Sequence, residues 1–250
     1  MTPRETRAIA VVEDHCLFAD ALLLALQLNG YDAWRVELEP DYSSTGRLVG
    51  SIMRLRPRTV VLDLDLGPQG DGMRLIEPLA LAGVSVVVVT GSVDRVRWGE
   101  CLRRGACKVV GKGASLGEIS DVMRRLDGGL PVLAPSEREE LIGVWRRHQI
   151  ETRRLRELLE SLTRREAEVL GMLMAGQQVS EIALVRCVSE STVRTQVKAI
   201  LAKLQVNSQL AAVGLANRAH WIAPAMPGRE LPSPRPPSVT GRITSGEGAR

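Results

Sequence analysis

The sequence predicts a doubly wound α/β domain with a five-stranded parallel sheet, followed by a separate all-α domain. Three observations support this. Over about the first 130 residues, apolar segments of strand length alternate with amphipathic segments of helical length, which is typical of a parallel sheet covered on both faces by helices. Residues 162–222 show helical periodicity alone. The chain has 250 residues, enough for two domains.

Five short apolar segments are expected to form the sheet. They are rich in valine, as strands buried on both faces should be. The predicted strands cover residues 8–13, 31–36, 59–64, 84–90 and 107–112. The helices expected between and after them cover residues 17–30, 45–55, 72–83, 93–105 and 115–129. Pro78 lies within the third helix and predicts that it is short or kinked, because proline removes a backbone hydrogen bond.

The rest of the chain predicts a linker, a helical domain and a tail. The expected divisions are a first domain at 1–130, a linker with a connecting helix at 131–161, a helical domain at 162–222 and a tail at 223–250. The tail is rich in proline, glycine and serine, a composition typical of disorder. The leucines of the connecting helix fit either a solvated spacer or a short dimer seam.

Composition and charge indicate the cellular location of the protein and the part of the chain that would bind a polyanion. No apolar run approaches the roughly 20 residues that span a bilayer, and the N-terminus does not resemble a signal peptide, so we expect a cytoplasmic protein. The four cysteines form no C-x-x-C pair, which favours reduced thiols. Residues 1–135 carry a net charge of −1 and residues 136–250 carry +5. A polyanion would therefore bind the second half.

Reactive side chains stand where the predicted strands end. Glu13 and Asp14 end the first strand, Asp63 the third, Thr90 the fourth and Lys112 the fifth. Ligands of an open α/β sheet bind beyond these carboxyl ends. Converging carboxylates repel one another, and Mg²⁺ would relieve the repulsion. Asp63 could then attack a phosphoryl group, while Lys112 neutralises the charge and Thr90 donates a hydrogen bond.

The motifs VVEDH, VVLDLDLGPQGDG, VVVVTG and GACKVVGK resemble those of the receiver domain of two-component response regulators, over residues 8–130. The resemblance implies that Asp63 is the phosphoacceptor and that a sensor histidine kinase is the phosphoryl donor. It also implies a Mg²⁺ site in which Asp14 and Asp63 bind directly and Glu13 binds through water. The backbone carbonyl of Asp65 would be a further ligand.

Two positions depart from the receiver pattern, and two alternatives follow. Val109 stands where the family usually has Tyr or Phe, and Gly91 where it often has Ala. A receiver that acts without phosphate, as a protein-binding switch, is one alternative. The other is a phosphatase similar to the haloacid dehalogenases, because DLDLG also resembles their D-x-D motif. In such an enzyme Asp65 would be the general acid and base.

Residues 180–200 predict a helix-turn-helix, whose second helix is expected to begin at Ser191 or Thr192. The N-terminal end of such a helix enters the major groove of DNA. The pattern LTRRE, SEIA and TVRTQVKAILAKL resembles the LuxR-type helix-turn-helix of the NarL/FixJ class, over about sixty residues. The positions expected to contact DNA are Thr192, Arg194, Thr195, Lys198 and Lys203.

Together the two resemblances predict a transcriptional regulator that binds double-stranded DNA under the control of phosphorylation. They imply a homodimer when Asp63 is phosphorylated. They also imply a switch rather than an enzyme that turns over substrate. The charge of the phosphoryl group would shift the populations of two conformations of the protein.

Overall fold

The computed structural model describes residues 8–38 and 44–224. The chain divides into two compact units, Met1–Glu151 and Thr152–Arg250. Each unit is a separate body with its own core. Residues 225–250, which make up most of the predicted tail, lie outside the described residues.

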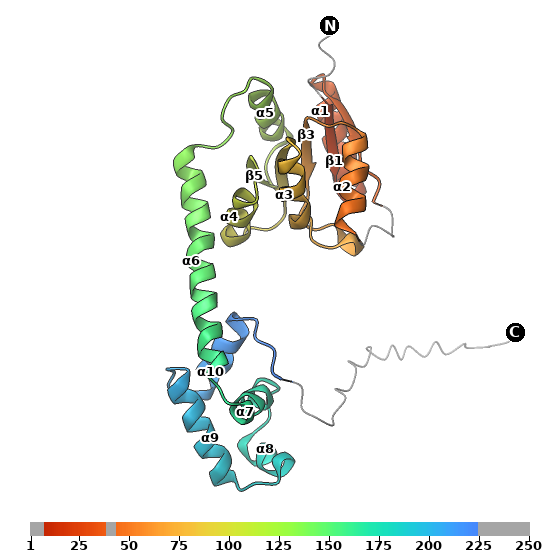
Figure 1. Cartoon of the computed structure of the whole chain (residues 1–250). Coiled ribbons are helices and arrows are strands. Elements are labelled where there is room, and N and C mark those ends of the chain that lie inside the picture. Colours follow the sequence, from red (N-terminus) through yellow and green to blue (C-terminus); the bar gives the residue numbers. More distant parts are fainter. Residues whose placement is uncertain (1–7, 39–43, 225–250) are drawn as a thin grey trace, which may run out of the picture. The chain divides into compact units, whose positions relative to one another are not determined.

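The first unit contains the predicted five-stranded parallel sheet (Figure 1). The strands are β1 (Ala8–Val12), β2 (Asp32–Arg35), β3 (Thr59–Leu62), β4 (Ser85–Thr90) and β5 (Lys108–Gly111), in the order β2-β1-β3-β4-β5. Val12 pairs with Leu62 across the two central strands. The next residues, Glu13 and Asp63, therefore leave the sheet side by side.

Five helices cover the two faces of the sheet, which confirms the doubly wound fold. They are α1 (Cys16–Leu28), α2 (Thr45–Arg54), α3 (Met73–Leu81), α4 (Arg95–Arg103) and α5 (Leu116–Asp127). Val11, Val61 and Val87 face a core shared with α1 and α5. Their neighbours Val60 and Val86 face the core shared with α2, α3 and α4. Helix α3 is short and contains Pro78, as predicted.

The loop after β3 contains a short 3-10 helix, η2 (Gly67–Gln69). A single helix, α6 (Pro135–Glu160), then follows the last helix of the sheet domain. The connecting helix was predicted, but its first half is part of the first unit. Leu141 on this half is buried in the same core as Leu102 of α4.

The second unit is all α-helical. Beyond the end of α6 it contains α7 (Arg164–Met174), α8 (Val179–Arg186), α9 (Glu190–Lys203) and α10 (Gln209–Arg218). Val193, Val197 and Ile200 of α9 are buried in its core. The prediction that α9 begins at Ser191 or Thr192 was wrong. The helix begins at Glu190, one or two residues earlier, because the hydroxyl of Ser189 accepts a hydrogen bond from the Thr192 amide and caps the helix. No helix within the described residues is long and apolar enough to cross a membrane.

Candidate functional site

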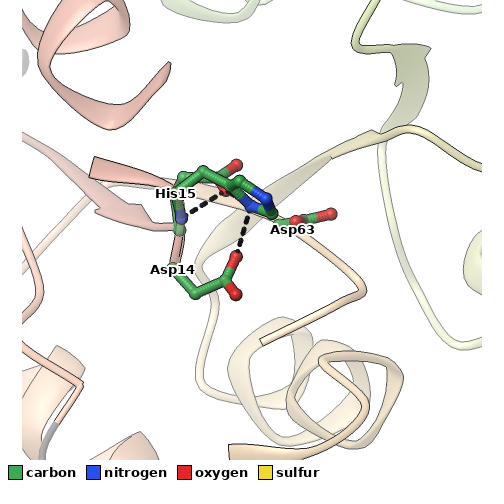
Figure 2. A group of neighbouring side chains, drawn as sticks. Asp14, His15 and Asp63 are labelled. Atoms are coloured by element: carbon green, nitrogen blue, oxygen red, sulfur yellow. Dashed lines mark hydrogen bonds and ion pairs between the residues drawn. The ribbon is translucent and has the colours of Figure 1, made fainter. Parts of the chain in front are cut away.

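Three carboxylates meet at the carboxyl edge of the sheet. Ligand atoms of Glu13, Asp14, His15 and Asp63 all lie within 4.8 Å of one another. Figure 2 shows Asp14 and His15 from the end of β1 beside Asp63 from the end of β3. The pairing of β1 with β3 brings these side chains together, as the positions of the acids predicted.

Asp63 is held firmly at the end of β3. Its side chain is 2% exposed. One carboxylate oxygen accepts a hydrogen bond of 2.7 Å from the Leu64 amide, and the other lies 2.8 Å from the Lys112 ammonium. The apolar strand therefore fixes the acid, and Lys112 balances its charge.

Lys112 bridges two acids. Its Nζ atom is 2.8 Å from Asp63 and 2.8 Å from Glu13, and it lies 5.0 Å from the centre of the Phe18 ring. Burial favours the neutral amine and would lower the pKa of Lys112. Hydrogen bonds to Asp63 and Glu13 outweigh that effect and raise its pKa above the ordinary value. The lysine is therefore a permanent cation at this edge of the sheet.

His15 is a member of the cluster that the sequence analysis did not select. Its Nδ1 atom lies 2.8 Å from Asp14, and its backbone amide donates a hydrogen bond to Glu13. The hydrogen bond with Asp14 raises the pKa of His15. Its position directly after two strand-end acids was the available signal.

The donor set suits a hard divalent cation. Carboxylate oxygens are the ligands that Mg²⁺ prefers, and this ion usually keeps several waters. Asp14 supplies a carboxylate that is 25% exposed, beside the buried carboxylates of Glu13 and Asp63. Lys112 and His15 pair with these acids, which relieves their mutual repulsion.

Thr90 and Lys112 line one cavity with Asp63. The cavity measures about 450 Å³ and is also lined by Leu17, Phe18 and Arg97. Thr90 is buried, and its hydroxyl accepts a hydrogen bond of 3.1 Å from the amide of Ser92. A group attached to Asp63 would enter a space that the Thr90 hydroxyl also borders.

The conformation of the loop after Asp63 requires Asp65, Gly67 and Gly72 at their positions. The Asp65 carboxylate accepts a hydrogen bond of 3.2 Å from the Gly67 amide, so this side chain shapes the turn. Gly67 has a positive φ of 56°. A Cβ atom on Gly72 would lie 2.1 Å from the carbonyl oxygen of Asp63. Only glycine lets the chain pass this close to the acid.

The residues expected to contact DNA lie along α9, but their side chains are in different situations. Arg194 and Lys198 are exposed, and Arg194 forms an ion pair of 3.1 Å with Glu190 one turn earlier. The Thr195 hydroxyl donates to the Ser191 carbonyl. The Thr192 hydroxyl lies 2.8 Å from that of Ser189, in the cap of the helix.

Lys203 is joined to a different helix of the same unit. Its ammonium lies 2.6 Å from the carboxylate of Glu166 and 3.4 Å from the Ser161 carbonyl. Glu166 also accepts hydrogen bonds from the amide and hydroxyl of Thr163, in the capping box that begins α7. Any phosphate contact by Lys203 would therefore compete with an internal ion pair.

The second unit matches a known family of DNA-binding domains. The model for "Bacterial regulatory proteins, luxR family" matches residues 160–216. This range contains α7, α8 and α9 and most of α10.

Curated relatives match over most of the chain. The chain is 27% identical over 207 residues to the glycerol metabolism activator of Pseudomonas putida, covering 82% of this chain and 92% of the relative. It is 28% identical over 180 residues to the response regulator protein VraR of Staphylococcus aureus, covering 71% and 82%. Among solved structures, the RcsB response regulator of Salmonella typhimurium aligns with a TM-score of 0.47 at 20% identity, covering 84% of this chain and 98% of that one.

The fold and the strand-end site define a receiver-type α/β domain joined to a LuxR-type helix-turn-helix domain. Residues 160–216 belong to the luxR family of bacterial regulatory proteins, and the chain is similar over most of its length to response regulators. It is a DNA-binding transcriptional regulator of the two-component type.

Proposed function

We propose that a sensor histidine kinase phosphorylates Asp63 and that the phosphoryl group controls DNA binding by the second unit. One observation carries the proposal. The Lys112 ammonium lies 2.8 Å from both Asp63 and Glu13, and Lys112 lines the same cavity as Asp63 and Thr90. A nucleophilic carboxylate, a fixed cation and a hydroxyl are the groups that phosphoryl transfer to an aspartate requires.

In the transfer step a carboxylate oxygen of Asp63 forms a bond to phosphorus while the P–N bond of a phosphohistidine breaks. The imidazole leaves and takes up a proton. Lys112 stays beside the new phosphoryl oxygens and neutralises them, because it is already paired with Asp63. Thr90 then turns its hydroxyl from accepting the Ser92 amide to donating to a phosphoryl oxygen.

A bound Mg²⁺ would neutralise charge on the phosphoryl group during transfer. We assign Asp14 and Asp63 as its direct ligands, Glu13 as a ligand through water, and the carbonyl of Asp65 as a further ligand. The three carboxylates and their short separations support this assignment.

The second unit would read DNA with the exposed start of α9. We assign Arg194, Thr195 and Lys198 to the groove, with Thr192 and Lys203 as flanking phosphate contacts. Phosphorylated chains would form homodimers in the cytoplasm and bind paired half-sites. The proposed functional divisions are a receiver at 1–130, a linker at 131–161 and a DNA-binding domain at 162–222.

The test uses Mg²⁺ and acetyl phosphate, a small phosphoryl donor, with intact-protein mass spectrometry. The expected result is one phosphoryl adduct that hydroxylamine removes, as it should an acyl phosphate. The variant Asp63→Asn should gain no adduct, whereas the matched control Asp65→Asn should keep most of it. An inactive Asp65→Asn together with turnover of small phosphomonoesters would favour the phosphatase alternative instead.

Mapping of DNA occupancy across the genome tests the regulatory half of the proposal. The wild-type chain should occupy a set of sites that Asp63→Asn loses under inducing conditions. Equal occupancy by both chains would favour a receiver that works without phosphate.

A further inference from the structure

A continuous series of hydrogen bonds leads from Thr90 into α4. The Ser92 amide donates to the Thr90 hydroxyl, and the Asp94 amide donates to the Ser92 hydroxyl at 3.3 Å. The Asp94 carboxylate caps α4 by accepting from the Val96 amide. The indole N–H of Trp98 donates to the Ser92 carbonyl at 2.8 Å. Ser92 is therefore bound to Thr90 by its amide and to Trp98 by its carbonyl.

Trp98 lies where a movement of Thr90 could be transmitted to α4. On β5 the residue Val109 is aliphatic and buried, so it offers no ring that could follow the movement of Thr90. The half-buried Trp98 ring packs against the core that α4 shares with the sheet and with Leu141. A shift of Ser92 would therefore reach α4 through the indole.

The backbones of α4 and α6 are in close contact within the first unit (Figure 1). A Cβ atom on Gly99 would lie 2.1 Å from the Leu141 carbonyl oxygen and 2.9 Å from the Cβ atom of Trp145. Only a glycine allows this approach. A small rotation of α4 would consequently disturb the contact.

Polar contacts hold the first half of α6 in the same place. Arg138 donates to the carbonyl oxygens of Leu102 and Ala106 at the end of α4, at 2.6 Å and 3.0 Å. Arg95 pairs with Glu140 at 2.8 Å. The Arg103 guanidinium lies 4.7 Å from the centre of the Trp145 ring. These partners all come from α4 or the turn after it.

We propose that Trp98, through Ser92, couples phosphorylation of Asp63 to release of the first half of α6 from α4. The inference rests on the proposed function. When Thr90 turns toward the phosphoryl group, the Ser92 amide loses its acceptor and the loop shifts. Trp98 follows its bond to the Ser92 carbonyl, α4 moves, and the contact between Gly99 and Leu141 opens. The helix that leads to the DNA-binding unit then loses its packing on the receiver.

Amide hydrogen exchange of peptides from residues 135–145 measures the release in the full chain. Mg²⁺ and acetyl phosphate should raise this exchange about five-fold or more, since packing supplies most of the stability of a helix. The variant Trp98→Phe keeps a ring but loses the indole donor. It should gain the same phosphoryl mass as wild type, yet its exchange should rise less than about two-fold.

Trp145→Phe is the matched control, at the same helix contact. Within the described residues the indole nitrogen of Trp145 has no hydrogen-bond partner, so the substitution removes no such bond and should keep the full response. Thr90→Val is a second test, because it keeps the shape of the side chain and removes the hydroxyl. Its phosphorylated form should show no rise.

The outcomes separate the two proposals. Absence of any phosphoryl adduct on the wild-type chain overturns the proposed function and the coupling with it. A normal adduct without increased exchange overturns only the coupling. A full response in phosphorylated Trp98→Phe also overturns it, because the indole bond would then carry no signal.

Discussion

The Lys203 ammonium lies 2.6 Å from the Glu166 carboxylate, and this ion pair joins the last turn of α9 to the first turn of α7. The Glu166 side chain is 10% exposed and the Lys203 side chain 36%. The pair is therefore only partly in contact with solvent, and the amide and hydroxyl of Thr163 donate to the same Glu166 carboxylate oxygen that Lys203 contacts. The pair therefore links α9 directly to α7, in addition to the packing of α9 in the core.

Loss of this pair should destabilise the second unit. Lys203→Met is expected to lower the free energy of unfolding by about 2 kcal/mol, because it leaves a largely buried carboxylate without its cation. Urea unfolding can be followed at Trp221, which packs against this core, by fluorine NMR of protein labelled with fluorotryptophan. Lys198→Met on the exposed face is the control and should change stability by less than about 0.5 kcal/mol. Equal effects of the two variants would mean that the pair contributes nothing.

The same pair predicts how acid affects the second unit. Burial alone would raise the pKa of Glu166, but hydrogen bonds from Lys203 and Thr163 lower it below the ordinary value of 4.5. The unfolded chain therefore takes up this proton first as the pH falls. The contribution of the pair is complete above pH 4.5 and is lost as the pH falls through the lower pKa of the folded state. Wild type and Glu166→Gln should differ in stability at neutral pH and converge as the pH falls through the lowered pKa of Glu166 in the folded state. A constant difference across this range would contradict the assignment.

Salt titration distinguishes the roles of Lys198 and Lys203 on DNA. Lys198→Ala should cost about 1–3 kcal/mol on a site found by occupancy mapping and should weaken discrimination at one base position, if Lys198 reads a base edge. Lys203→Met should lower the salt slope by about one only if Lys203 leaves Glu166 to bind a phosphate. The measurement compares specific and scrambled duplexes. An unchanged slope with reduced stability would restrict Lys203 to its internal role.

The cysteines should react very differently in the native protein. Cys101 is fully buried in α4, and burial raises the pKa of its thiol to about 12. Cys16 and Cys187 are exposed free thiols. Alkylation at mildly alkaline pH, followed by peptide mass mapping, should modify the exposed pair and leave Cys101 unmodified until urea is added. Equal labelling of Cys101 would show that the core beneath α4 opens readily.

Much of the sheet and its site could be predicted because both depend on local patterns. Buried parallel strands appear as apolar runs, and all parallel strands present their carboxyl ends at one edge. Glu13, Asp63 and Lys112 therefore had to meet once the strand order was that of a doubly wound sheet. Phosphorylation at Asp63 and the DNA contacts stay predictions.

The remaining features depend on contacts between distant segments. Nothing near Lys203 in the sequence indicates that Glu166 would be its partner. The first half of α6 carries apolar residues at 141, 142 and 145, but the sequence left a solvated spacer and a dimer seam both open and did not indicate packing on α4. The bond between Trp98 and Ser92 depends on a side-chain direction that periodicity does not specify.

The contact at Gly99 also has a genetic consequence. Every glycine codon becomes an alanine codon by one base change, and a methyl group at position 99 cannot fit against the Leu141 carbonyl. A single mutation could thus separate α6 from the receiver without any signal. Selection for signal-independent expression of the target genes should repeatedly recover substitutions at this codon, which belongs to neither the strand-end site nor the helix proposed to read DNA.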